Sequence, residues 1–241
     1  MSKQKTALIT GAASGIGLAI SQHLAKQGYK VWVSDVNLES AQKVAIQIKG
    51  QALALDVTQQ EHIDAAVASI ELADGRLDVL VNNAGIQHVA PLEDFPVDKW
   101  RLVNDVLLVG PAMLTRGFLP MMRSNNYGRI VNISSINAQK GQFGQSNYSA
   151  AKAGIHGFTK ALAQEVAAKG VTVNTVSPGY VMTPMVAKIA PEVLAKIAAG
   201  IPVGRLGEPE EIGKAVAYLA SKDCGYVTGS DFSINGGQHM S

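Results

Sequence analysis

The chain has 241 residues, a formal net charge of +2 and 47% hydrophobic residues. This length suits one domain over residues 1–241 with a substantial core, and the scattered lysines and arginines lack the clustered basic patch of a nucleic-acid binder. Glycines and charges interrupt the apolar runs well before the ~18 residues of a membrane helix, so we expect no membrane segment, and the single Cys224 has neither a disulfide partner nor metal ligands at useful spacing.

Short β-rich runs alternate with amphipathic stretches of helical length. This alternation predicts an α/β fold: a single-domain, Rossmann-like, doubly wound parallel sheet of seven strands with helices on both faces. The segment 182–200 interrupts the alternation and predicts short helices over the strand ends. The predicted strands are Thr6–Thr10, Lys30–Ser34, Ala52–Asp56, Leu77–Val81, Arg129–Ile133, Val171–Val176 and Asp231–Ile234.

A glycine-rich turn follows the first predicted strand. The sequence Thr10-Gly-Ala-Ala-Ser-Gly-Ile-Gly17 lies between an apolar run and a stretch with helical spacing, although the spacing Gly11-x-x-x-Gly15-x-Gly17 differs from the usual dinucleotide fingerprint. The glycines let the backbone turn sharply and approach a pyrophosphate, and the amides at the helix N-terminus supply donors and a favourable dipole. The turn therefore predicts a phosphate-binding site.

Three side chains near the middle of the chain form a second motif. Tyr148 and Lys152 are four residues apart at the start of a helical stretch, and Ser135 lies 13 residues before Tyr148 at the end of a predicted strand. Residues four apart share one helix face, so we expect the Lys152 ammonium to lower the pKa of the Tyr148 phenol from about 10. Tyr148 then exchanges a proton with an alcohol or carbonyl oxygen, to which Ser135 donates a second hydrogen bond.

Together these motifs resemble the short-chain dehydrogenase/reductase family. The resemblance covers essentially the whole chain and includes Asn82-Asn-Ala-Gly85 after the fourth predicted strand and the run Pro178–Thr183 after the sixth. It implies an oxidoreductase in which hydride passes between a nicotinamide cofactor and a carbonyl carbon. The catalytic residues implied are Ser135, Tyr148 and Lys152.

The resemblance also implies a cofactor site. Asp56 with Val57 matches the family's adenine contact, Val181 with Thr183 matches its contacts to the nicotinamide carboxamide, and residues 182–200 match a mobile substrate lid. The expected cofactor contacts are Gly11, Ser14, Gly15, Ile16, Gly17, Asp35, Asp56, Val57, Asn83, Ala84, Gly85, Tyr148, Lys152, Pro178, Gly179, Val181 and Thr183.

Asp35 bears on the choice between NAD and NADP. It ends the second predicted strand, 18 residues after Gly17, where a carboxylate accepts hydrogen bonds from both ribose hydroxyls of NAD. A 2′-phosphate there would meet like charge, and the following residues, Val36 and Asn37, supply no cation. We therefore predict that NADH is preferred over NADPH. The alternative is an aspartate that only caps the next helix.

One position departs from the family pattern. By resemblance, an asparagine is expected on the fourth helix, seven residues after a tryptophan-like position, where it orders water for a proton relay to the lysine. Counting from Trp100 gives Leu107, so the relay as usually drawn is in doubt, and Asn104, one turn earlier, is its candidate substitute. Activity is still expected, because hydride transfer and the Tyr148 acid do not need that side chain directly.

Two resemblances compete over the substrate. The segment 82–96 looks like (R)-3-hydroxybutyrate dehydrogenases, in which the glutamine matching Gln87 contacts acetoacetate. Residues 128–241 closely resemble acetoacetyl-CoA reductases of polyhydroxyalkanoate synthesis. This second resemblance implies contacts with the acyl group from Gln142, Gln145 and Tyr180. The mixture leaves open an unusual natural lineage or a sequence joined between the two segments.

The charge of the predicted substrate pocket favours a thioester. A small buried carboxylate needs a charged or multiply hydrogen-bonded clamp, and the hydroxybutyrate dehydrogenases place a histidine and a lysine where this chain has Asn137 and Gln145. We therefore predict reduction of acetoacetyl-CoA to (R)-3-hydroxybutyryl-CoA. The alternative is oxidoreduction of free acetoacetate and 3-hydroxybutyrate, which an inward-turned Lys140 would favour. A remote alternative is a non-catalytic NAD-binding interaction module.

The cellular setting is predicted from the first residues and from the resemblance. Residues 1–5 lead straight into a strand and offer neither the apolar segment nor the cleavage site of a signal peptide, which predicts a cytoplasmic location. The resemblance implies a homotetramer, with the predicted helix Tyr148–Lys169 in one dimer contact and the C-terminal segment in another.

Overall fold

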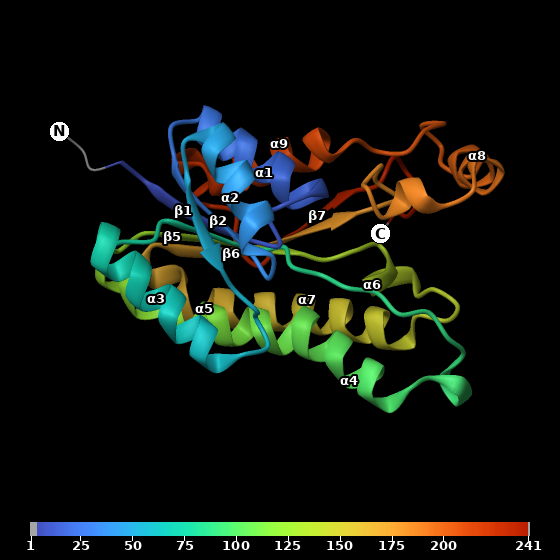
Figure 1. Ribbon diagram of the computed structural model, residues 1–241, viewed down its shortest axis with the longest axis horizontal. Helices are drawn as coiled ribbons and strands as arrows, with labels where there is room; N and C mark the ends of the chain where they lie inside the picture. Colours follow the sequence, from blue (N-terminus) through green and yellow to red (C-terminus); the bar gives the residue numbers. More distant parts are fainter. Residues whose placement is uncertain (1–3, 241) are drawn as a thin grey trace.

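A seven-stranded sheet forms the middle layer of the computed structural model, which describes residues 4–240 (Figure 1). Residues 1–3, on which the predicted absence of a signal peptide partly rests, lie outside the described range. The strand order is β3-β2-β1-β4-β5-β6-β7, and the neighbouring strands are parallel. The predicted fold class is confirmed. The strands are β1 Thr6–Thr10, β2 Lys30–Asp35, β3 Gln51–Ala54, β4 Val79–Asn82, β5 Gly128–Ile133, β6 Val171–Pro178 and β7 Asp231–Ile234.

Strands β1 and β7 have the predicted bounds, whereas the others differ by one or two residues at their ends. Strand β3 stops before Asp56, because the Asp56 carboxylate accepts hydrogen bonds from the amide and the hydroxyl of Thr58, at 2.9 and 2.7 Å, and begins a turn. Strand β6 continues to Pro178, which pairs with Ile234 of β7 and accepts a hydrogen bond from the Ile136 amide at 3.1 Å.

Two layers of helices cover the sheet (Figure 1). One layer contains α1 (Gly15–Lys26), α2 (Leu38–Ile48) and α9 (Pro209–Ala220), and the other contains α3 (Gln60–Asp74), α4 (Val97–Asn104), α5 (Gly110–Ser124) and α7 (Ser146–Val166). The shorter helical elements are η1 Leu92–Asp94, the π-helical turn η2 Asp105–Val109, α6 Asn137–Lys140, η3 Ala167–Lys169, η4 Val186–Lys188, α8 Pro191–Ala199 and η5 Lys222–Cys224.

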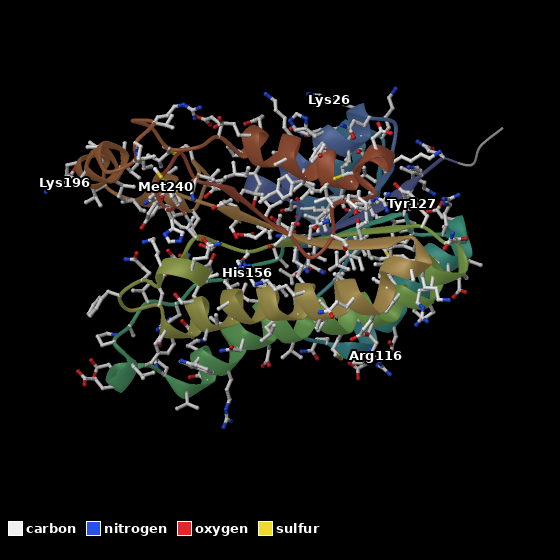
Figure 2. All side chains as sticks on the ribbon, turned by 180° about the vertical axis from the view of Figure 1, so that it is seen from behind. Lys26, Arg116, Tyr127, His156, Lys196 and Met240 are labelled. Atoms are coloured by element: carbon white, nitrogen blue, oxygen red, sulfur yellow. The ribbon has the colours of Figure 1, made fainter. Side chains whose placement is uncertain are left out.

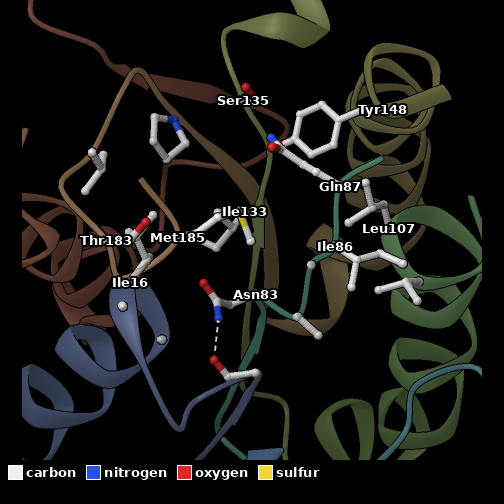
Figure 3. A pocket seen from close by; sticks show the side chains of 18 of the residues that line it. Ile16, Asn83, Ile86, Gln87, Leu107, Ile133, Ser135, Tyr148, Thr183 and Met185 are labelled. Atoms are coloured by element: carbon white, nitrogen blue, oxygen red, sulfur yellow. Dashed lines mark hydrogen bonds between the residues drawn. The ribbon is translucent and has the colours of Figure 1, made fainter. Parts of the chain in front are cut away.

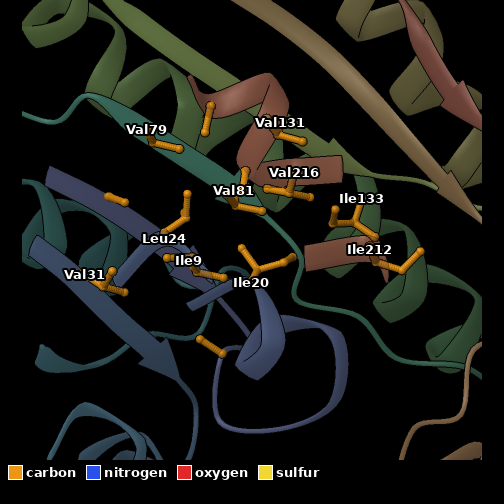
Figure 4. Packing of buried hydrophobic residues seen from close by; sticks show 14 of the residues in the cluster. Ile9, Ile20, Leu24, Val31, Val79, Val81, Val131, Ile133, Ile212 and Val216 are labelled. Atoms are coloured by element: carbon orange, nitrogen blue, oxygen red, sulfur yellow. The ribbon is translucent and has the colours of Figure 1, made fainter. Parts of the chain in front are cut away.

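Each helix layer packs on one apolar face of the sheet. Successive side chains of a strand point to opposite faces, so Leu8 of β1 belongs to one core cluster and Ile9 to the other. Figure 4 shows the cluster that contains Ile9, in which Ile20 of α1 and Val216 of α9 pack on Val81 of β4. Because both faces of the central strands are buried, the loops that follow these strands start from fixed points.

A polar cluster fixes the amino ends of the central strands. The Asp78 carboxylate is buried, and it accepts a hydrogen bond from the Thr6 amide at 2.8 Å and a charge-assisted pair of bonds from Arg76. The buried Arg129 guanidinium donates to several main-chain carbonyls and stacks on the Tyr127 ring, 4.4 Å from its centroid. These buried charges therefore have partners at the end of the sheet opposite the glycine turn.

A continuous helical segment, Val97–Ser124, joins α4, η2 and α5. By length and composition this segment is apolar enough to cross a membrane. The expectation that no apolar stretch is as long as a membrane helix was therefore wrong. The reason is that its few charged residues, such as Arg116, lie on the exposed side of the helix. On the other side Phe118 and Met122 are fully buried against the sheet. The apolar face thus belongs to the core.

Candidate active site

A cavity of about 690 Å³ opens at the carboxyl ends of the strands (Figure 3). It is lined by the turns after β1, β2, β3, β4, β5 and β6, by the start of α7 and by part of the segment 182–200. The winding direction of the sheet reverses between β1 and β4, which is where doubly wound sheets bind ligands. All the residues predicted to be catalytic or to contact a cofactor line this one cavity.

The glycine turn forms one wall of the cavity. Gly11 and Gly15 have φ angles of +59° and +53°, a backbone region that favours glycine. A Cβ atom on Gly17 would lie 2.3 Å from the carbonyl oxygen of Gly11, so a larger residue does not fit there. The start of α1 is therefore a cradle with little side-chain bulk, and it fits the pyrophosphate of a dinucleotide.

Asn83 fixes the glycine turn against the end of β4. Its side-chain amide donates to the carbonyls of Thr10 and Gly11, at 2.9 and 3.0 Å, and the dashed line in Figure 3 is one of these bonds. The Thr10 hydroxyl accepts hydrogen bonds from the amides of Asn83 and Ala84, at 3.0 and 2.9 Å. Asn83 therefore shapes the cradle as well as lining the cavity.

Asp35 lies at the end of β2, on the rim of the cavity. Its carboxylate accepts hydrogen bonds from the amides of Ala13 and Asn37, at 3.2 and 3.1 Å, and within residues 4–240 it forms no ion pair. The cap of α2 is Asn37, whose side chain accepts from the Ser40 amide at 3.0 Å. Asp35 is therefore not the helix cap, and its carboxylate fits the hydroxyl pair of a ribose.

The segment 182–200 lies against the glycine turn. The Thr183 hydroxyl accepts a hydrogen bond from the Val186 amide at 3.3 Å and begins η4, and its methyl carbon is 3.4 Å from the place of a Cβ atom on Gly15. The predicted short helices are present as η4 and α8. No side chain of α8 is fully buried, and the segment reaches the cavity through residues that precede this helix, from Thr183 to Ile189.

The three predicted catalytic residues meet between β5 and α7, and Figure 3 shows two of them, Ser135 and Tyr148. Ser135 follows β5, while Tyr148 and Lys152 lie on successive turns of α7. The Lys152 ammonium donates to the Ile133 carbonyl at 2.5 Å and lies 5.8 Å from the centroid of the Tyr148 ring. The Tyr148 hydroxyl has hydrogen-bonding interactions with Ser135 and Gln87. The site therefore offers a phenol, a hydroxyl and an amide around one position.

Burial changes the pKa values of both titratable groups. It raises the pKa of Tyr148 above 10, and the hydrogen-bonding interactions with Ser135 and Gln87 act in the opposite direction. The expected lowering by Lys152 is not found here, because the ammonium is directed to the carbonyl of Ile133. Burial also lowers the pKa of Lys152 to about 8. Tyr148 therefore holds its proton at neutral pH.

The predicted substrate residues divide into two groups. Gln87, Gln145 and Tyr180 line the cavity. Gln142 does not, because its side chain is exposed and accepts a hydrogen bond from the Lys140 ammonium at 2.9 Å. Lys140 is thus engaged outside the cavity rather than turned inward.

Two neutral amides occupy the positions at which a cationic clamp was considered. The Asn137 side-chain amide donates a hydrogen bond to the side-chain oxygen Oε1 of Gln145 at 3.0 Å. Both residues line the cavity. Because the amides bind each other, this wall of the cavity is polar and uncharged.

Comparison with known proteins assigns the chain to a family. A family profile described as "Enoyl-(Acyl carrier protein) reductase" matches residues 11–239. The acetoacetyl-CoA reductase of Cupriavidus necator is 48% identical over 98% of this chain and 99% of its own, and that of Shinella zoogloeoides is 50% identical over 97% and 98%. A 3-oxoacyl-[acyl-carrier-protein] reductase of Haemophilus influenzae is 41% identical over 98% and 99%. The chain belongs to the short-chain dehydrogenase/reductase family.

Family membership fixes the general activity. Short-chain dehydrogenase/reductases bind NAD or NADP, and this chain is an oxidoreductase. The side-chain-poor start of α1 and the Asp35 carboxylate fit such a cofactor on structural grounds. The alternative of a non-catalytic interaction module is therefore not supported.

Leu107 is the residue that counting from Trp100 places where the resemblance led us to expect a relay asparagine. It lies in the π turn η2, is buried, and packs in a small cluster with Val103, Ala151 and Tyr148. Asn104 does not replace the missing amide, because its side chain donates to the Trp100 carbonyl at 2.9 Å and does not line the cavity. This short-chain dehydrogenase/reductase therefore has an apolar wall where a water-ordering side chain was expected.

Sequence reasoning missed much of the apolar lining of the cavity. Leu, Ile and Val carry no signal that separates a site wall from a core, and only the interrupted segment 182–200 hinted at its residues. Ser134 was missed although it precedes the catalytic Ser135. The lining residues not predicted as site residues are Val36, Leu55, Ile86, Val89, Val106, Leu107, Ile133, Ser134, Ile136, Asn137, Pro184, Met185, Val186 and Ile189.

The buried Lys152 predicts a pH dependence of stability. Its folded pKa of about 8 is below the ordinary value of 10.5, so the folded state loses this proton first as the pH rises. We expect the free energy of unfolding of the wild type to increase relative to that of Lys152→Met by about 3 kcal/mol between pH 8 and 10.5. Urea titrations of both proteins at pH 7, 8.5 and 10 measure this difference. Parallel curves would contradict the depressed pKa.

Proposed function

We propose that the enzyme reduces acetoacetyl-CoA to (R)-3-hydroxybutyryl-CoA with NADH, using Tyr148 as the general acid. The observation that carries the proposal is the meeting of Tyr148, Ser135 and Gln87 in the cavity that also contains the glycine cradle. Curated relatives named acetoacetyl-CoA reductase, 46–50% identical over nearly the whole chain, support the choice of substrate.

The catalytic side chains are arranged to serve a reduction. When bound, the nicotinamide cofactor supplies the hydride. Tyr148 holds its proton at neutral pH and gives it to the substrate oxygen as negative charge develops there. The Ser135 hydroxyl oxygen accepts a hydrogen bond from the main-chain N–H of Asn137 at 3.1 Å. The Ser135 proton is therefore left to donate to the same substrate oxygen. The Ser135 and Gln87 side chains, whose hydrogen-bonding interactions act to lower the Tyr148 pKa, stabilise the tyrosinate that remains.

The uncharged wall supports a thioester over a free acid. A carboxylate beside Asn137 and Gln145 would lose its hydration without gaining a cation. A thioester carries no charge at that place, so a neutral amide pair suffices to orient its carbonyl. The position of Gln87 beside the Tyr148 hydroxyl favours a second candidate, the oxidoreduction of free acetoacetate and 3-hydroxybutyrate. The reason is that the resemblance of segment 82–96 implies a contact between this glutamine and acetoacetate.

Further parts of the proposal rest on the family resemblance. We propose that residues 182–200 act as a lid, and the absence of fully buried side chains in α8 supports this. A homotetramer and a cytoplasmic location stay predictions from the sequence.

Replacement of Tyr148 by Phe tests the mechanism. The change removes the acid but keeps the ring that packs beside Leu107. We expect kcat to fall by at least about 100-fold, the usual scale for general acid catalysis, while the dissociation constant of NADH changes little. Steady-state kinetics and NADH fluorescence titration measure the two quantities. Turnover that survives the substitution would remove Tyr148 from the mechanism.

A comparison of two substrates separates the candidate functions. We expect kcat/KM for acetoacetyl-CoA to exceed that for free acetoacetate by at least about 100-fold, because a carboxylate left without a cation costs about 3 kcal/mol or more. NADH oxidation at 340 nm with each substrate gives the ratio. A Gln145→Lys variant, which supplies a cation, should lower the ratio of kcat/KM for acetoacetyl-CoA to kcat/KM for free acetoacetate. Preference for free acetoacetate in the wild type would identify the hydroxybutyrate dehydrogenase instead.

Cofactor preference tests the assignment of Asp35. We expect NADH to be preferred over NADPH, and Asp35→Ala to weaken NADH binding by about 10- to 100-fold through loss of charge-assisted hydrogen bonds worth about 1.5–3 kcal/mol. Asn37→Ala, which removes only the cap of α2, is the control and should keep the preference. The assignment fails if Asp35→Ala leaves the NADH to NADPH ratio of kcat/KM unchanged.

A further inference from the structure

A polar network lies behind the catalytic residues, between α7 and the strands β5, β6 and β7. His156 is at its centre, one turn after Lys152 and on the side of α7 that faces the sheet (Figure 2). Its Nε2 atom is 2.7 Å from the Ser134 hydroxyl oxygen and 3.3 Å from that of Ser177. The mechanism proposed above uses none of these three side chains, although their contacts reach the residues that it does use.

The network ends at the Asp231 carboxylate on β7. Its Oδ1 atom accepts hydrogen bonds from the hydroxyls of Thr175 and Ser177, both at 2.7 Å. Its Oδ2 atom accepts from the Gln139 side-chain amide at 2.8 Å. The His156 Nε2 atom is 3.8 Å from Oδ1. Because an ionised carboxylate only accepts hydrogen bonds, it directs the Ser177 proton toward β7.

One arrangement of protons satisfies all these contacts. A hydroxyl has a single proton; that of Ser134 goes to the Lys152 carbonyl at 3.1 Å, and that of Ser177 goes to Asp231. Both hydroxyl oxygens therefore accept from His156, so its Nε2 atom carries a proton. Burial lowers the pKa of His156, with Asp231 acting in the opposite direction. The neutral ring already supplies the required donor.

Three consecutive residues of the strand end contact the catalytic side of α7. The Ile133 carbonyl accepts from the Lys152 ammonium, the Ser134 hydroxyl donates to the Lys152 carbonyl, and Ser135 interacts with the Tyr148 hydroxyl. Of these contacts, the one between the Ser134 hydroxyl and the Lys152 carbonyl is supported by a further side chain, because the His156 Nε2 atom also binds the Ser134 hydroxyl. A change at Ser134 is therefore passed to its neighbours on both sides.

We propose that His156 is a positioning residue for the reaction, an inference that rests on the proposed function. By donating from Nε2, it keeps the Ser134 hydroxyl on the Lys152 carbonyl and so fixes the end of β5 against α7. The spacing between Ser135 and Tyr148 is then set from behind the site. Such spacing matters, because a misplacement of about 1 Å costs about 100-fold in rate.

Substitutions of His156 test this role. His156→Leu removes the donor, and we expect kcat to fall about 10- to 100-fold while KM and the NADH dissociation constant stay within about twofold. His156→Gln places an amide N–H near the position of Nε2 and should restore most of kcat. Ser134→Ala removes the acceptor without a substitution in α7, and it should lower kcat by the same factor as His156→Leu. The double variant should lose no more than either single one, because both changes break one contact.

A buried hydrogen bond on the same helix supplies the matched control. Thr159→Val loses the bond from the Asn132 side chain, 2.9 Å long, and should lower the melting temperature while it keeps kcat. A kcat of Ser134→Ala within twofold of the wild type would overturn the proposal, as would a loss in His156→Leu that His156→Gln does not restore. If the wild type fails to reduce acetoacetyl-CoA, the proposed function fails separately, and the same kcat ratios are measured with the 3-oxo substrate that it does reduce.

Discussion

The burial of the Lys152 ammonium between α7 and β5 is the constraint on which the site depends. Only 5% of this residue is exposed, and a buried charge is unfavourable unless polar groups surround it. The carbonyl of Ile133 meets that need, which requires the second turn of α7 to rest on the end of β5. The same placement brings Tyr148 beside Ser135, so the geometry of the reacting groups follows from how one charge is accommodated. The lowered pKa of Lys152 has the same cause, because burial disfavours its charged form.

A second junction, on the other side of the cavity, is built with neutral groups. Thr10 and Asn83 exchange hydrogen bonds between the ends of β1 and β4, and these bonds hold the glycine turn in place. The turn itself has little side-chain bulk to stabilise it, so its shape depends on these neighbours. The two junctions lie on different strands of one rigid sheet. Cofactor cradle and acid are therefore held at a fixed separation without direct contact between them.

The sequence was most informative where spacing alone implies geometry. A Tyr and a Lys four residues apart, or glycines between a strand and a helix, have few structural solutions, so the fold and the residues that meet in the cavity were predictable. Gln142 lies outside the cavity because a loop side chain follows local partners, here Lys140, that spacing does not reveal. The raised pKa of Tyr148 depends on burial, and the position of Leu107 in a π turn depends on the packing of a whole helix. The contacts of His156 were not predicted, because Ser134, Ser177 and Asp231 are far from it in the sequence and meet it only in the folded sheet.

The buried cluster of Asp78 and Arg129 at the amino ends of the strands has a consequence for how such an enzyme changes over time. Charges that hold the sheet together are gathered at one end, and the cavity is lined by loops at the other. Mutations that reshape those loops leave the ion pairs and the core untouched, so new specificities can arise without loss of folding. Substrate specificity can thus change at one edge of this sheet while the charges at the opposite edge continue to hold the strands together.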